Sequence, residues 1–113
     1  MAISEELNAR FREALGGLVG VSERNMMGGT CFMVMGHMVG GAWIEPSGAE
    51  VFMFRVGVEN DAAALAIGHG EVMEMGGRRM RGLYRIAAED CPARVFDRWR
   101  SLAVGHALSL PPK

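Results

Sequence analysis

The sequence predicts an α+β fold, a two-layer sandwich of one mainly antiparallel sheet of about six strands with helices at the N-terminus, in the middle and at the C-terminus. Two observations predict it. Apolar residues recur at helical spacing in only three places, and the segments between them are short, apolar and separated by glycine-rich turns. The resulting order, α-β-β-β-β-α-β-β-α, argues against a doubly wound parallel sheet, in which strands and helices alternate. With 113 residues and no linker or internal repeat, residues 1–113 are expected to form one domain.

The first helix is expected from Ser4 to about Leu18. Ser4 is a favoured N-cap residue, and Glu5 and Glu6 place carboxylates in the first turn, near the positive end of the helix dipole. Gly20 is expected to end the helix. One apolar stripe is formed by Leu7, Phe11, Leu15 and Leu18.

A β-meander is expected over roughly residues 24–56. Gly28-Gly29 is expected to form a turn or bulge, and Gly36-His37 has the length of a two-residue hairpin turn, where glycine supplies the positive φ. Pro46-Ser47-Gly48 is a third turn signal. The strands are expected at residues 24–27, 30–35, 38–45 and 51–56.

A short helix and a second hairpin follow. The helix is expected over residues 62–67, capped by Asn60 or Asp61, and the hairpin joins residues 71–75 to 80–87 through a turn at 76–79. Because side chains alternate along a strand, we expect Leu83 and Arg85 on one face and Tyr84 and Ile86 on the other.

A final helix is expected after Asp90-Cys91-Pro92, since proline suits the first turn of a helix. Its buried side is expected to carry Phe96, Trp99 and Ala103, which are three and four residues apart. Gly105 is expected to weaken the end of this helix.

Composition and charge narrow the classes of function. The net charge is −1, with four Arg and ten Asp/Glu in residues 1–77 and eight Lys/Arg and three Asp/Glu in residues 78–113. We interpret this asymmetry as two complementary halves, because the neutral total and few aromatics argue against direct nucleic-acid binding. No apolar run reaches the ~20 residues of a membrane helix, and the first residues lack a signal-peptide layout, so a cytoplasmic location without membrane contact is expected.

The sequence contains no pattern of residues typical of catalysis or of a cofactor site. His37, His69 and His106 fall at predicted turns or helix ends, and no nucleophile or acid pairs with them at a recognisable spacing. Cys31 and Cys91 match no metal or redox spacing and are expected to be small buried hydrophobes. We therefore expect no enzyme, no catalytic residues, no cofactor and no metal.

Ten methionines raise one alternative. Met33 with Met35, and Met73 with Met75, form Met-x-Met pairs that period-two spacing would place on one strand face. Together with Cys31 or His37, their thioethers would suit Cu(I) or a small molecule. The simpler interpretation, which we favour here, is that the methionines fill irregular space in the core.

Two glycine-punctuated segments stand out, one from Arg24 to Met38 and one from Met73 to Leu83. They resemble the N-terminal domain of the TfoX/Sxy family of bacterial proteins linked to competence regulation. The first segment matches the family pattern at Arg24, Met26, Gly28, Gly29, Phe32, Gly36 and Met38. The second runs from Met73 to Leu83 and keeps Gly77, Met80 and Gly82, while Met75, Arg79 and Leu83 replace the usual Phe, Pro and Trp.

The resemblance implies a two-layer sandwich similar to the secretion-chaperone-like fold and a non-enzymatic role. Longer family members act as transcriptional co-regulators and carry a second, helical domain, which is not expected here because the chain ends after Lys113. We therefore expect a regulatory domain that contacts a protein partner, with transcription machinery as one class and a homodimer through sheet edges as another. Arg78, Arg79 and Arg81 are the first contact residues to test.

Overall fold

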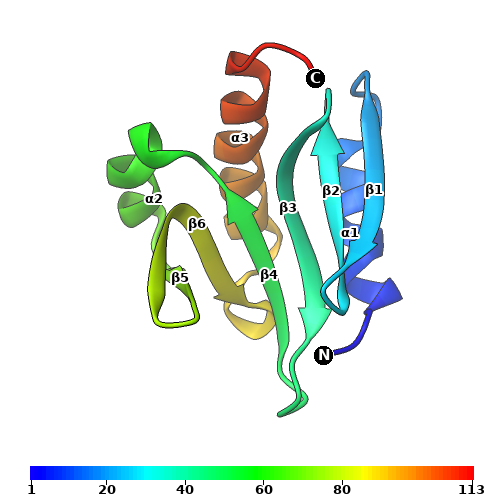
Figure 1. Cartoon of the computed structure of the whole chain (residues 1–113), viewed down its shortest axis with the longest axis vertical. Coiled ribbons are helices and arrows are strands. Elements are labelled where there is room, and N and C mark those ends of the chain that lie inside the picture. The colour runs from blue at the N-terminus through cyan, green and yellow to red at the C-terminus, as the bar shows by residue number, and fades with distance from the viewer.

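The computed structural model describes all residues 1–113 and confirms the α+β fold (Figure 1). One antiparallel sheet has the strand order β1-β2-β3-β4-β6-β5. Its strands are β1 (Val21–Met26), β2 (Gly29–Val34), β3 (His37–Ile44), β4 (Glu50–Arg55), β5 (Glu71–Met75) and β6 (Arg78–Ala87). The helices are α1 (Glu5–Leu15), α2 (Asp61–Ile67) and α3 (Ala93–Ser109), with short 3-10 turns at Val58–Asn60 and Ala88–Asp90. None of these helices has the length and apolar character needed to span a membrane.

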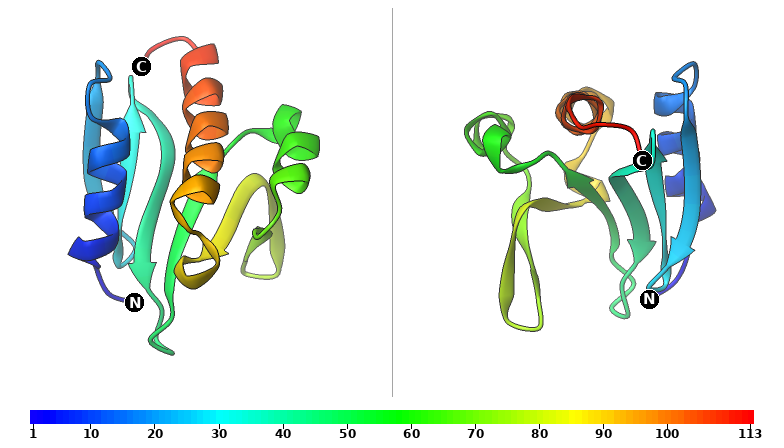
Figure 2. Two further views of the ribbon diagram at one scale, coloured as in Figure 1. Left: turned by 180° about the vertical axis from the view of Figure 1, so that it is seen from behind. Right: turned by 45° about the horizontal axis from the view of Figure 1, so that its top comes forward.

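The core lies between α1, α3 and one face of the sheet (Figure 2). Aromatic rings dominate it: Phe11 of α1 lies 4.9 Å from Phe32 of β2 and 5.1 Å from Phe96 of α3, measured between ring centroids. Trp99 is fully buried and its Nε1 donates a hydrogen bond to the Gly68 carbonyl oxygen at 3.1 Å. The cluster of 20 buried residues contains no methionine, although Met35 packs against it and Met53 is buried. The expectation that methionines fill the core therefore fails for most of them.

The helices follow the predicted pattern with shifted ends. Ser4 caps α1, its Oγ accepting a hydrogen bond from the Leu7 amide at 3.2 Å. The helix ends at Leu15 instead of Leu18, because Gly16 leaves the helical conformation and Gly17 has a φ of +90°. By contrast, α3 runs through Gly105 to Ser109, since buried residues on both sides of this glycine hold the helix in place.

Two predicted turns lie one residue earlier in the chain than expected. The turn residues are Met27-Gly28, with φ of 53° and 83°, and Met35-Gly36, with φ of 53° and 84°. Gly29 and His37 are the first residues of β2 and β3. Tight hairpin turns of this type need positive φ at both central positions, which methionine adopts here against its own preference. The second hairpin turns at Gly76-Gly77 alone, so Arg78 and Arg79 belong to β6.

The sheet is curved, and β3 contains two glycines at positions where a side chain would not fit. A Cβ on Gly40 of β3 would overlap the Met53 carbonyl oxygen and lie 2.9 Å from Phe11 Cζ. A Cβ on Gly41 would likewise overlap the Thr30 carbonyl oxygen, and the register between β2 and β3 shifts next to Phe32. The β5–β6 hairpin projects to the side opposite α3, which leaves a concave sheet face without helices (Figure 2).

Candidate functional site

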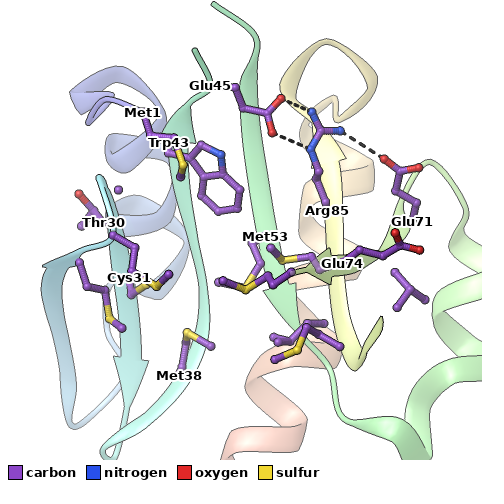
Figure 3. Close-up of a pocket in the computed structure, with 18 residues that line it drawn as sticks. Met1, Thr30, Cys31, Met38, Trp43, Glu45, Met53, Glu71, Glu74 and Arg85 are labelled. Carbon is purple, nitrogen blue, oxygen red and sulfur yellow. Dashed lines mark hydrogen bonds and ion pairs between the residues drawn. The ribbon is translucent and has the colours of Figure 1, made fainter. Parts of the chain in front are cut away.

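A groove of about 740 Å³ lies on the sheet face opposite the helices (Figure 3). Twelve of its 18 lining residues are hydrophobic. Eight of the ten methionines of the chain are among them, and we call this surface the methionine groove. Its methionines are Met1, Met26, Met27, Met38, Met53, Met73, Met75 and Met80.

Strand alternation places these side chains on the open face. In β4, Phe52 and Phe54 belong to the core, and Met53 between them lines the groove. In β6, Leu83 and Arg85 line the groove while Tyr84 and Ile86 are core residues, as the sequence predicted. In the middle of β4 and the second half of β6, the strand pattern therefore assigns alternate residues to the core and to the groove.

A bulge at Gly82 brings a further methionine into the groove. Gly82 has a φ of +82°, and its carbonyl oxygen accepts hydrogen bonds from the amides of both Val56 and Gly57. This breaks the alternation, so that Met80 and Leu83, three residues apart, line the same surface.

The floor of the groove is a row of residues paired across five strands. Cys31 of β2 pairs with Gly41, Gly41 with Met53, Met53 with Arg85, and Arg85 with Glu71 of β5. Gly41 contributes no side chain between Cys31 and Met53, and a Cβ there would overlap the Thr30 carbonyl oxygen. The row therefore runs from an apolar centre to a charged rim.

The charged rim is built around Arg85. Its Nε donates to Glu45 Oε2 at 3.0 Å and its Nη2 to Glu45 Oε1 at 2.5 Å, whereas its Nη1 lies 3.4 Å from Glu71 Oε1 (Figure 3). The hydrogen bonds from Arg85 hold the pKa of Glu45 below its usual range. Glu74 also lines the groove. The rim therefore has three carboxylates and one guanidinium, a net charge of about −2 at neutral pH.

The cysteines are not reactive thiolates. Cys31 lines the groove but is buried, and burial raises the pKa of its thiol. Cys91 belongs to the core, where burial raises its pKa to about 11. In their present environment both are neutral at physiological pH, and Cys31 presents a soft, apolar surface.

The structure separates the residues of the predicted soft-metal site. His37 does not line the groove, and its Nε2 lies 2.5 Å from the Pro111 carbonyl oxygen. Met33 lies in β2 but Met35 is a turn residue, so the prediction that they share a strand face is wrong. Both methionines of the pair in β5 do line the groove. No group of three or more His, Cys, Asp or Glu side chains is placed to hold a metal ion.

The histidines are not grouped either. His106 lies within α3, where its Nδ1 is 2.5 Å from Glu59 Oε2 and ties the helix to the first 3-10 turn. His69 is exposed in the loop after α2. The three imidazoles therefore lie in separate parts of the structure and do not form one site.

The predicted arginine contacts lie beside the groove and not in it. Arg78, Arg79 and Arg81 are exposed on β6, and only Arg81 has an ion-pair partner, Asp61, at 3.8 Å. The other residues singled out in the sequence divide by role. Gly28, Gly36 and Gly77 form turns, Gly82 forms the bulge, Phe32 is core, Arg24 is exposed on β1, and Gly29, Met26, Met38 and Met80 line the groove.

The comparisons with known proteins do not assign a function. No family model matches the chain, and neither a curated protein nor a solved structure matches it. The functional argument therefore depends on the groove itself. Sequence reasoning placed Leu83 and Arg85 on one strand face but assigned no site role to them, nor to Trp43, Met53, Glu45, Glu71 and Glu74. Alternation with buried neighbours indicates the face of a residue such as Met53, but not that this face is a groove.

Proposed function

We propose that the protein is a non-enzymatic interaction module that binds an amphipathic helix of a partner protein in the methionine groove. One observation carries the proposal: eight of ten methionines gather on the one sheet face that no helix covers. A large exposed apolar surface on a small domain marks a binding site. A helix laid into an apolar groove is a recurring way to bury such a surface.

The chemistry of methionine favours a protein segment of variable shape. The side chain is unbranched, and its polarizable thioether adapts to different neighbours, so methionine-rich surfaces accept several partners. Met26, Met27 and Met75 retain 43%, 68% and 41% exposure, which leaves them free to reorient around an occupant. Met53, 6% exposed, provides the fixed floor.

The dimensions also suit a short helix. A groove of about 740 Å³ holds many water molecules, and their release from an apolar surface would drive binding. The six residues of β4 run for about 20 Å, the length of a helix of about 13 residues. A single metal ion would leave most of this space empty.

The resemblance to the TfoX/Sxy family supports a partner linked to transcription or competence regulation, and a cytoplasmic location. Arg78, Arg79 and Arg81 adjoin the groove wall and would contact acidic groups on such a partner outside the groove. Because all three are exposed, substitution of the three by Ala should leave the fold intact, as circular dichroism can check.

A peptide titration tests the groove directly. The probe is an 18-residue helix with leucine at positions i, i+3, i+4 and i+7 and glutamine elsewhere. Trp43 lines the groove and reports occupancy by fluorescence, whereas Trp99 is fully buried in the core and should not respond. A Trp43→Phe protein should lose the signal and thereby assign it.

Matched variants decide the outcome. Met38→Glu and Met75→Glu place a charge in the groove and should weaken binding at least about tenfold. Leu65→Glu introduces the same charge on α2, at a side chain that is 72% exposed and outside the groove, and should bind like the wild type. The proposal would be contradicted if Met38→Glu and Met75→Glu bound the peptide as tightly as the Leu65→Glu control. It would also be contradicted if the folded wild-type protein did not bind the peptide.

A second candidate is a soft-metal site, which one observation favours: Cys31, Met38 and Met53 lie in the same groove. Thiolate and thioether ligands select Cu(I), and the neutral Cys31 thiol would release its proton when it bound the metal. Anaerobic titration with Cu(I) tests this, because uptake should be lost when Met38 and Met53 are both replaced by leucine. No uptake by the wild type would exclude it.

A further inference from the structure

We propose that the methionine groove selects helices carrying basic residues, and that Glu71 and Glu74 on β5 are the carboxylates that receive them. The inference rests on the proposed function and adds the chemistry of the partner. It starts from the charges that line the groove, which are Glu45, Glu71, Glu74 and Arg85, three acidic side chains against one basic side chain.

The three carboxylates are not equivalent. Glu45 uses both oxygens on Arg85, at 3.0 Å and 2.5 Å, and its side chain is only 27% exposed. This geometry is a bidentate pair, the strongest arrangement of these two groups. Glu45 therefore neutralises Arg85 and is not available to a ligand.

Glu71 remains available. Its Oε1 lies 3.4 Å from Arg85 Nη1, and its side chain is 73% exposed. Exposed ion pairs of this length contribute little, because water solvates both groups. A cation on a bound helix can therefore replace Arg85 as the partner of Glu71 without cost to the Glu45 pair.

Glu74 has no ion-pair partner in the structure, although it lies opposite Arg79 in the β5–β6 register. It lines the groove on the same strand as Met73 and Met75. A lysine or arginine could lay its aliphatic stem along these methionines and extend its charged group to the carboxylate. An apolar floor beside two exposed carboxylates, Glu74 without an ion-pair partner and Glu71 in a weak pair, thus matches a helix that is apolar on one face and basic on its flank.

The opposite wall differs in charge. Met1, Met26, Met27 and Gly29 contribute no charged side chain, and the only formal charge there is the α-amino group of Met1. The acidic groups therefore lie on one side only. A helix with basic residues on one flank would bind in one orientation.

Three peptides with the same leucine face test the inference. Two flanking positions carry Lys, Gln or Glu, and the dissociation constants are measured by Trp43 fluorescence at low and high NaCl. We expect the Lys peptide to bind about tenfold more tightly than the Glu peptide at low salt, because two exposed charge pairs each contribute modestly. The difference should shrink at high salt, where exposed charges are screened.

The double variant Glu71→Gln plus Glu74→Gln should abolish this preference and leave binding of the Gln peptide unchanged. Its control, Glu13→Gln plus Glu89→Gln, removes the same charge from exposed positions outside the groove and should keep the preference. If the Gln peptide binds but all three peptides bind equally, this inference is wrong and the proposed function stands. If no peptide binds the folded protein, both are wrong.

Discussion

Replacing Gly40 of β3 by alanine tests how tightly the curved sheet is packed against α1. Gly40 pairs with Phe54 in the ladder between β3 and β4. An added Cβ would overlap the Met53 carbonyl oxygen and lie 2.9 Å from Phe11 Cζ. Neither neighbour can yield easily, because one is backbone within the ladder and the other is a ring that is 1% exposed.

The expected cost follows from this geometry. Extra methyl groups in a packed core cost about 1–3 kcal/mol, and contact with backbone places Gly40→Ala at the upper end, about 3 kcal/mol. Gly48→Ala is the first control: nothing lies within 4 Å, so only the φ of +90° opposes it, at about 1 kcal/mol. Gly105→Ala is the second: it is exposed within α3 with nothing within 4 Å, and it should stabilise by up to about 1 kcal/mol.

Urea unfolding followed by circular dichroism measures all three variants. With a slope of about 2 kcal/mol per molar urea, Gly40→Ala should lower the midpoint by about 1.5 M. Gly105→Ala should raise it. The reasoning would be refuted if Gly40→Ala were no more destabilising than Gly48→Ala, because the close approach of α1 and β4 would then have no energetic consequence.

Three further predictions concern the groove and its rim. Glu45→Gln should flatten the loss of stability on acidification below the ordinary glutamate pKa of about 4.3: the Arg85 hydrogen bonds lower the folded-state pKa of Glu45, so its contribution is present above the unfolded pKa and is lost as the carboxylate protonates. Acid titrations followed by circular dichroism would show this, and equal slopes for variant and wild type would contradict it. Met27→Asn should raise the melting temperature by about 2–4 °C, since asparagine tolerates the φ of 53° better than methionine; a lower melting temperature would show that the methionine contacts outweigh the strain. Hydrogen peroxide, which transfers oxygen to exposed thioethers such as Met75, should abolish peptide binding while the far-ultraviolet spectrum stays unchanged; undiminished binding after mass spectrometry confirms the sulfoxides would refute the role of the methionines.

The order of the elements and the faces of β6 could be predicted from local pattern. Period-two alternation identified Leu83 and Arg85 as opposite in direction to Tyr84 and Ile86, and the structure agrees. These predictions depend only on neighbouring residues. The observed turns at Met27-Gly28 and Met35-Gly36 lie one residue before the predicted positions. The pairing between the two strands decides which residues take positive φ, and the pattern within a single strand does not show that pairing.

The groove could not be predicted in the same way. The hydrophobicity of a strand residue indicates that its side chain is covered, either by the core or by a binding partner. It does not indicate which sheet face the helices cover. In this fold both α1 and α3 cover the same face, so Met53 and its neighbours remain on the other. The ion pair of the rim could not be predicted either, because Glu45 and Arg85 are 40 residues apart and meet only through the topology of the sheet.

The alternation of Phe52, Met53 and Phe54 has a consequence for how this chain can vary. Phe52 and Phe54 are constrained by packing in the core, whereas Met53 between them is constrained by contact with the ligand of the groove. Saturation mutagenesis of Phe52, Met53 and Phe54, scored separately for abundance and for peptide capture, should therefore separate the middle position from its two neighbours. Specificity is then free to change at Met53 while Phe52 and Phe54 keep the protein folded.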